Sequence, residues 1–199
     1  MENETIFRIL LPVLLIAFIV HRGWQTRRRA PKQERVANTL QEEKSSPLVS
    51  ALGLIAMVSS LLYVVMPDWL AWAALPFPAW LRWLGVLVAI AGFALLEWAQ
   101  WALGKNWSDT PVKLKDHTLA KGGPYKFVRH PIYTAFLLIL TGPLLLSANW
   151  LVGLSWLSMT FIDVNERAAA EEGMLRQTFG ADYDNLTKKT GRFLPRLLG

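Results

Sequence analysis

Residues 122–133 read GGPYKFVRHPIY: a Gly-Gly-Pro turn, aromatic rings and basic or imidazole groups come directly before an apolar segment that reaches Ser147. Pro131 suits the first turn of a helix, because the amide hydrogen that proline lacks is not needed there. We therefore expect a helix that begins at Pro131, with His130 at its N-cap position and Arg129 just before it. A helix start of this kind attracts anions, so it can bind a ligand carboxylate. The alternative is that Arg129 and His130 only contact lipid phosphates.

The hydrophobic residues fall into long blocks. They make up 53% of the 199 residues, whereas only 18% are charged, and this balance is unlike that of a soluble protein. Crossing a bilayer takes about 20 apolar residues in a helix. The blocks predict an all-α integral membrane protein with five transmembrane helices, the last two forming a helical hairpin that turns at 147–149. The blocks are residues 6–20, 47–66, 80–103 and 132–164.

The basic residues predict the orientation of these helices. Of the 21 Lys and Arg residues, seven lie in 21–46, six in 104–130 and six in 167–199. Positively charged segments next to membrane helices stay in the cytoplasm. Five passes with the N-terminus outside and the C-terminus inside place all three segments there. Because this charge is spread over membrane boundaries, nucleic-acid binding is disfavoured. Residues 27–46, rich in charge and Gln, are expected to be a flexible linker.

Several kinds of chemistry are excluded or disfavoured by composition. The chain has no cysteine, which excludes disulfides, thiolate catalysis and cysteine metal ligands. Its three histidines, His21, His117 and His130, lack the spacing of a metal-binding helix, so no metal site is expected.

An acidic and basic helix is expected after the last apolar block, ending near Phe179-Gly180. Glu172 and Arg176 are four residues apart in the favourable order, so they are expected to form a solvated surface pair. Arg167 and Glu171 also share a face, but in the weaker order, and this favours other partners for them. Glu97 lies inside an apolar block, where an ionisable group is costly. It is either functional or paired with a nearby basic residue.

Motifs from residue 103 to residue 195 resemble, in order, those of the isoprenylcysteine carboxyl methyltransferase family. They are Asn106-Trp107-Ser108, His117-Thr118-Leu119, Gly123-Pro124-Tyr125, Arg129-His130-Pro131-x-Tyr133, Arg167 with Glu171-Glu172, Phe179-Gly180-x-x-Tyr183 and Arg192-Phe193-Leu194-Pro195. The wider group includes phospholipid N-methyltransferases, which share the paired-Glu element.

The resemblance implies a membrane enzyme that binds S-adenosylmethionine at the cytoplasmic face. It implies a single domain over 1–199, with three helices in 1–103 and the cofactor-binding and catalytic half in 104–199. The implied cofactor residues are His117, Leu119, Tyr125, Arg129, His130, Tyr133 and Glu171. Glu171 would hold the cofactor's ammonium group, and Arg167 would position an anionic acceptor; these two are the implied catalytic residues.

The acceptor implied by the resemblance is lipophilic, either a prenylated thiol bearing a carboxylate or a phospholipid. Two other readings of the sequence remain. Membrane reductases that use NADPH also carry an Arg-His-Pro-x-Tyr element, but they lack the helix with Glu171 and Glu172. A non-catalytic scaffold or transporter is disfavoured because the passes show no repeated halves.

Overall fold

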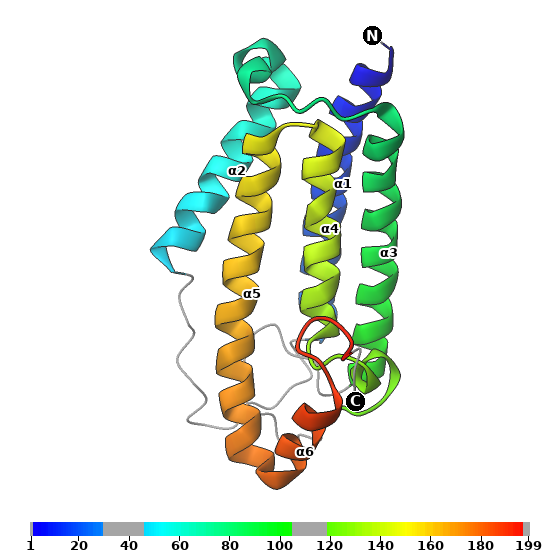
Figure 1. The fold of residues 1–199 in the computed structure, drawn as a ribbon, viewed down its shortest axis with the longest axis vertical. Helices are drawn as coiled ribbons and strands as arrows, with labels where there is room; N and C mark the ends of the chain where they lie inside the picture. The colour runs from blue at the N-terminus through cyan, green and yellow to red at the C-terminus, as the bar shows by residue number, and fades with distance from the viewer. Residues whose placement is uncertain (1, 30–45, 105–118, 197–199) are drawn as a thin grey trace. The chain divides into compact units, whose positions relative to one another are not determined.

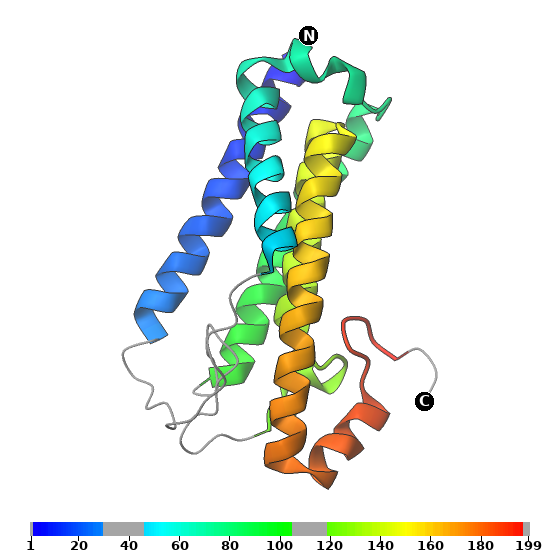
Figure 2. The ribbon, with the colours of Figure 1, turned by 90° about the vertical axis from the view of Figure 1, so that its left-hand side faces the viewer.

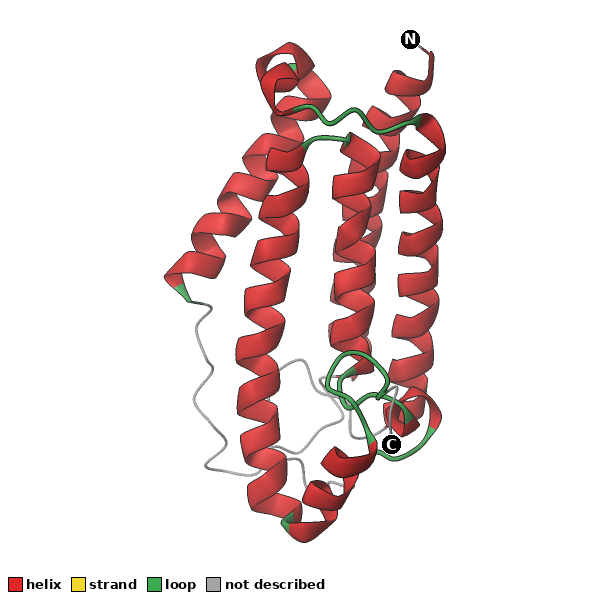
Figure 3. Ribbon diagram, in the orientation of Figure 1, coloured by secondary structure: helices red, strands yellow, loops and turns green. Residues whose placement is uncertain are grey.

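The computed structural model describes residues 2–29, 46–104 and 119–196. His117 and most of the expected linker at 27–46 therefore lie outside the described residues. All named elements of the described chain are helices, so the all-α expectation holds for them (Figure 3). They are α1 (Glu2–Arg29), α2 (Pro47–Val65), η2 (Pro67–Ala73), α3 (Ala79–Leu103), η4 (Gly123–Lys126), α4 (Pro131–Ser147), α5 (Trp150–Phe179) and α6 (Ala181–Lys189).

Three described helices are long and apolar enough to cross a membrane: Glu4–Gln25, Pro47–Val65 and Ala79–Leu103. Helix α4 is also apolar, but it is shorter. The expected hairpin is present, since α4 ends at Ser147 and α5 begins at Trp150, with Ala148 at φ +46° in the turn. Helix α5 then continues for 30 residues, through the acidic and basic positions, to Phe179.

Gly180 ends α5 as the sequence predicts. Its φ of +50° is a left-handed conformation that glycine adopts without steric cost. The chain turns sharply at this residue into α6 (Figure 2).

The chain divides into two compact units, each built from segments that are distant in sequence. Unit 1 comprises the described parts of Met1–His21, Ser45–Phe93 and Phe136–Asp163. Unit 2 comprises the described parts of Arg22–Lys44, Ala94–Ala135 and Val164–Gly199.

Unit 1 packs its helices closely through glycines. A Cβ on Gly142 of α4 would lie 2.5 Å from Leu14 of α1, and one on Gly153 of α5 would lie 2.3 Å from Leu144 of α4. Small residues of this kind let helix backbones approach in membrane proteins, where tight packing stabilises helix contacts. The end of α4 lies beside the connection from η2 to α3 (Figure 1), where Leu75 N–H donates to the carbonyl of Ala148 at 2.6 Å.

A buried arginine joins four helices of unit 1. Arg82 of α3 is 5% exposed, and its Nε and Nη2 donate to the carbonyl of Leu146 at 2.9 and 2.8 Å. Its Nη2 also donates to the Tyr63 hydroxyl at 3.0 Å, and its Nη1 donates to Glu4. The guanidinium lies 4.0 Å from the centre of the Phe7 ring. Arg82 thus satisfies a carbonyl at the end of α4, where no intrahelical donor is available.

Replacing Arg82 with Met should lower the stability of the protein by about 1–3 kcal/mol, because the Leu146 carbonyl and Tyr63 hydroxyl lose a buried donor. Thermal unfolding in detergent measures the change. Arg176→Met is the matched control, since Arg176 and its partner Asp184 have side chains 57% and 52% exposed. Loss of such an exposed pair costs about 0–1 kcal/mol. Equal effects of the two substitutions would contradict the role of Arg82.

Candidate functional site

The stretch at 127–130 pairs with the C-terminal part of the chain in unit 2. The backbone N–H groups of Arg129 and His130 donate to the carbonyls of Gly191 and Arg192 at 2.9 and 3.1 Å. Gly191 N–H donates in return to the Phe127 carbonyl at 3.2 Å. The C-terminal segment is thereby fixed beside the residues that precede α4.

Helix α4 begins at Pro131, and His130 takes the N-cap position, as predicted from the sequence. The His130 carbonyl accepts hydrogen bonds from the N–H groups of Tyr133 and Thr134, both at 3.1 Å. The His130 N–H, which could have faced an anion, is bonded to the Arg192 carbonyl instead. The side chains around this helix start therefore determine what it can bind.

The turn before α4 requires glycine at position 123. Gly123 has φ +54°, and a Cβ there would lie 2.8 Å from Ala102 of α3. The short helix η4 that follows buries Tyr125, which is 7% exposed. Burial raises the pKa of the Tyr125 hydroxyl, and the charge of Glu171 raises it further. Tyr125 is therefore a neutral hydroxyl within electrostatic reach of Glu171.

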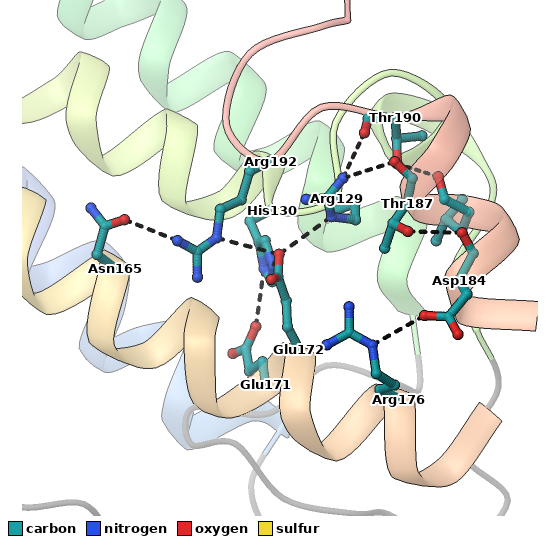
Figure 4. A network of polar contacts seen from close by, with 11 residues as sticks. Arg129, His130, Asn165, Glu171, Glu172, Arg176, Asp184, Thr187, Thr190 and Arg192 are labelled. Atoms are coloured by element: carbon teal, nitrogen blue, oxygen red, sulfur yellow. Dashed lines mark hydrogen bonds and ion pairs between the residues drawn. The ribbon is translucent and has the colours of Figure 1, made fainter. Parts of the chain in front are cut away.

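His130 lies between two consecutive carboxylates of α5 (Figure 4). Its Nδ1 is 3.2 Å from Glu171 Oε2, and its Nε2 is 3.1 Å from Glu172 Oε1. Burial by itself lowers the pKa of His130, but the hydrogen bonds and charges of Glu171 and Glu172 outweigh burial and raise it. Tyr133, whose ring stacks on His130 at 5.5 Å, donates its hydroxyl hydrogen to Glu171 Oε1.

Glu172 is the common partner of three cations. Besides His130, its Oε1 lies 3.3 Å from Arg129 Nε and 3.3 Å from Arg192 Nε. Burial raises the pKa of Glu172, but His130, Arg192 and Arg129 together lower it to about 2. Arg192 Nη1 also donates to Oδ1 of Asn165, an earlier residue of α5, at 3.1 Å (Figure 4). Glu172 is therefore held as a carboxylate.

The expected surface pair between Glu172 and Arg176 was wrong. Arg176 Nε instead bonds Asp184 Oδ1 of α6 at 3.0 Å. The turn at Gly180 brings Asp184 back to Arg176, while Glu172 faces the start of α4. An exposed pair within one helix contributes only about 0.3–0.5 kcal/mol, so three convergent cations outweigh it.

The structure brings together Arg129, His130, Tyr133 and Glu171, four of the predicted cofactor residues. Arg129 Nη1 also donates to the Thr190 carbonyl at 2.6 Å. Arg129 and His130, which were expected to bind a ligand carboxylate, thus both contact the Glu172 carboxylate.

The remaining predicted residues lie outside this cluster or outside the described residues. Leu119 and Arg167 are half-buried, and their roles stay predictions. His117 lies outside the described residues. Glu97 is exposed, whereas Gln100, three residues later on the same helix, is buried and 2% exposed. Arg192 belongs to the Arg192-Phe193-Leu194-Pro195 motif, but the sequence did not predict its contacts with Glu172 and Asn165.

Comparison with known proteins supports the resemblance. Residues 83–177 match the model of the isoprenylcysteine carboxyl methyltransferase (ICMT) family. Over these residues the chain is similar to the ICMT family. A protein-S-isoprenylcysteine O-methyltransferase of Dictyostelium discoideum is 27% identical over 64% of this chain and 55% of the relative. The human protein of the same name is 27% identical over 73% of this chain and 51% of the relative.

The fold agrees with a solved ICMT structure. The eukaryotic intramembrane Ras methyltransferase ICMT has a TM-score of 0.60 and 25% identity, covering 76% of this chain and 53% of that one. The chain thus spans about half the length of the relatives it matches. The matched range includes His130, Tyr133, Glu171 and Glu172, whereas Arg192 lies outside it.

Glu172→Gln should destabilise the protein by about 1.5–3 kcal/mol at pH 6, because it removes charge-assisted contacts to the buried His130 and the partly buried Arg129 and Arg192. The lowered pKa of Glu172 means that its stabilisation is present above its ordinary value of 4.5 and is lost as the pH falls toward about 2. The raised pKa of His130 means that its contribution is present below 6.5 and is lost as the pH rises. The Glu172–His130 pair therefore stabilises the folded protein most between pH 4.5 and pH 6.5.

Thermal unfolding of wild type and Glu172→Gln between about pH 6 and pH 3 measures this difference. The two midpoints should converge on acidification. Glu166→Gln, an exposed position on the same helix, should follow the wild type throughout. Parallel curves for Glu172→Gln and wild type would show that Glu172 carries no acid-sensitive stabilisation.

Proposed function

We propose that this chain is an integral membrane methyltransferase that uses S-adenosylmethionine and acts on a lipophilic acceptor of the isoprenylcysteine type, carrying a carboxylate. The observation that carries the proposal is the arrangement around Glu171. Its side chain is 27% exposed, next to the buried His130 and the partly buried Arg129 and Arg192, which all contact Glu172. The names of the matched relatives support carboxyl methylation and favour it over N-methylation of a phospholipid.

The described residues fit one end of the cofactor. An amino acid group needs a carboxylate for its ammonium, and Glu171 offers one that is partly exposed and oriented by Tyr133 and His130. Glu172 does not fit this role as well, because three cations surround its Oε1. The two consecutive carboxylates thus have different roles: Glu172 pairs with the cations of the cluster, and Glu171 binds the ammonium group of the ligand.

When bound, the cofactor supplies an activated methyl group on a sulfonium. It would transfer this methyl group to a carboxylate oxygen of the acceptor and leave as a neutral thioether, while Glu171, oriented by Tyr133 and His130, would hold its ammonium group. A carboxylate acceptor needs no proton removed, so the protein has to position the reactants and exclude water. This requirement agrees with a site whose titratable groups are engaged with one another.

Arg167 is proposed to position the acceptor. It lies one helical turn before Glu171 on α5 and is half-buried. A guanidinium can hold a carboxylate by two parallel hydrogen bonds, which lysine cannot reproduce.

We also propose five passes, with the N-terminus outside and the cluster at the cytoplasmic face. Helix α4 and the first part of α5 supply the fourth and fifth passes, since α5 is longer than the roughly 20 residues of one crossing. The distribution of Lys and Arg supports this orientation.

Single cysteines at Asp68 and Lys121 should be labelled from opposite sides of sealed vesicles. The chain has no other cysteine, and both positions are exposed. A membrane-impermeant maleimide added outside and then after permeabilisation measures the sidedness. Labelling of both positions from one side would overturn the proposed orientation.

Glu171→Gln should weaken binding of S-adenosylhomocysteine by about ten- to a hundredfold, because a hydrogen bond to a charged group contributes about 1.5–3 kcal/mol. Calorimetric titration of the purified protein measures the dissociation constant. Glu166→Gln is the matched control and should bind as the wild type does. Unchanged affinity in Glu171→Gln would remove the assignment of the ammonium to this residue.

Methyl transfer itself tests the proposed function and the role of Arg167. With labelled S-adenosylmethionine, the wild type should methylate small prenylated thiols bearing a carboxylate in preference to total membrane lipid. Arg167→Lys should reduce this transfer strongly while the dissociation constant of S-adenosylhomocysteine stays within about threefold, less than the 1.4 kcal/mol of a tenfold change. If affinity falls with activity, Arg167 belongs to the cofactor site. If label enters only membrane lipid, the acceptor class is wrong.

A further inference from the structure

The short helix η2 in unit 1 has two distinct faces. In a 3₁₀-helix, side chains three residues apart lie on the same side. Leu70 and Ala73 form the inner pair, 5% and 0% exposed, while Trp69 and Trp72 form the outer pair, 67% and 66% exposed. The helix thus presents two indoles outward on a packed apolar base.

Neighbouring segments hold η2 in place. Asn149, which is 2% exposed, donates from Nδ2 to the Leu70 carbonyl at 2.9 Å. Ala74 and Asn149 form an antiparallel bridge just beyond the helix. The ring of Trp72 meets that of Trp150 edge to face, with centroids 5.3 Å apart. The outward indoles are therefore held on a fixed support.

Trp150 extends the outer pair through its ring contact with Trp72. We name as the indole surface the three exposed residues Trp69, Trp72 and Trp150. Trp72 donates its indole N–H to the Trp69 carbonyl at 3.1 Å. An indole combines a large apolar body with one polar N–H, which suits a place where one end is apolar and the other is wet.

The charge around the indole surface excludes attraction to anionic partners. Between residues 66 and 83, the sequence has one basic residue, the buried Arg82, and one acidic residue, the exposed Asp68. A surface that binds nucleic acid or anionic lipid by charge carries exposed Lys or Arg. The indole surface therefore fits an electrically neutral partner.

The helices on either side of η2 identify that partner. Helix α2, which ends at Val65, and helix α3, which begins at Ala79, both have the length and hydropathy of membrane spans. The connection between two such spans lies at the level where the hydrocarbon ends and the headgroups begin, and tryptophan is enriched at this level. We propose that the indole surface lies in the headgroup region of the bilayer, with a zwitterionic lipid surface as its partner.

Fluorescence quenching of the full chain in phosphatidylcholine vesicles tests this proposal without reference to enzymatic activity. The emission of the outer pair is the difference between wild type and a Trp69→Phe/Trp72→Phe double variant. Bromines placed on the lipid chains near the glycerol should quench this emission at least about twofold more than bromines near the chain ends, as expected for an interfacial indole. Replacing part of the lipid with an anionic one should leave the quenching unchanged.

Trp156 provides the matched control. It is 9% exposed, and its indole N–H donates to Ser60 Oγ at 3.0 Å inside unit 1. The emission lost in Trp156→Phe should resist brominated lipid at either depth and also resist acrylamide in the water.

Three results would overturn the proposal. Quenching of the outer pair by acrylamide but not by lipid bromines would place the surface in water. Stronger quenching by the deep bromines would place it in the hydrocarbon. Protection from all quenchers, together with a lower particle mass for the double variant in detergent, would show that a second copy of the chain covers the surface.

Discussion

The cluster in unit 2 depends on one carboxylate oxygen, Glu172 Oε1. Charged groups taken out of water are costly unless they are paired and hydrogen-bonded. His130, Arg129 and Arg192 all lie within 3.3 Å of this oxygen, so each charge offsets the burial cost of the others. These three residues come from the start of α4 and from the C-terminal segment, while Glu172 belongs to α5. Removing this one oxygen would leave three cations without their common partner.

The same arrangement explains why two adjacent glutamates need not do the same thing. Successive residues of a helix point about 100° apart, so Glu171 and Glu172 meet His130 through different ring nitrogens. Three cations surround Glu172, whereas Glu171 contacts only the His130 imidazole and the Tyr133 hydroxyl among the pairs described above. A cationic ligand group finds less competition at Glu171. The proposed cofactor role of Glu171 therefore follows from the saturation of its neighbour.

Unit 1 contains a comparable polar contact group, around Arg82, in apolar surroundings. Arg82 is buried among membrane-length helices, where an isolated charge is costly. Its hydrogen bonds to the Leu146 carbonyl and the Tyr63 hydroxyl, and its contact with Glu4, satisfy the guanidinium. Arg82 thus joins four helices of unit 1, and the half-buried Glu172 joins three segments of unit 2. The indole surface differs because its side chains are exposed, and the Trp72 indole N–H donates to the neighbouring Trp69 carbonyl.

The sequence by itself determined the helices and several of their ends. Apolar length marked the three helices long enough to cross a membrane, Pro131 marked the start of α4, and Gly180 marked the end of α5, because each depends on neighbours in the chain. The motifs also located four of the residues that cluster. Only the tertiary structure decided that Glu172 pairs with Arg129, His130 and Arg192 rather than with Arg176. Spacing within one helix reports which side chains share a face, but it cannot report which residues elsewhere in the chain that face will meet.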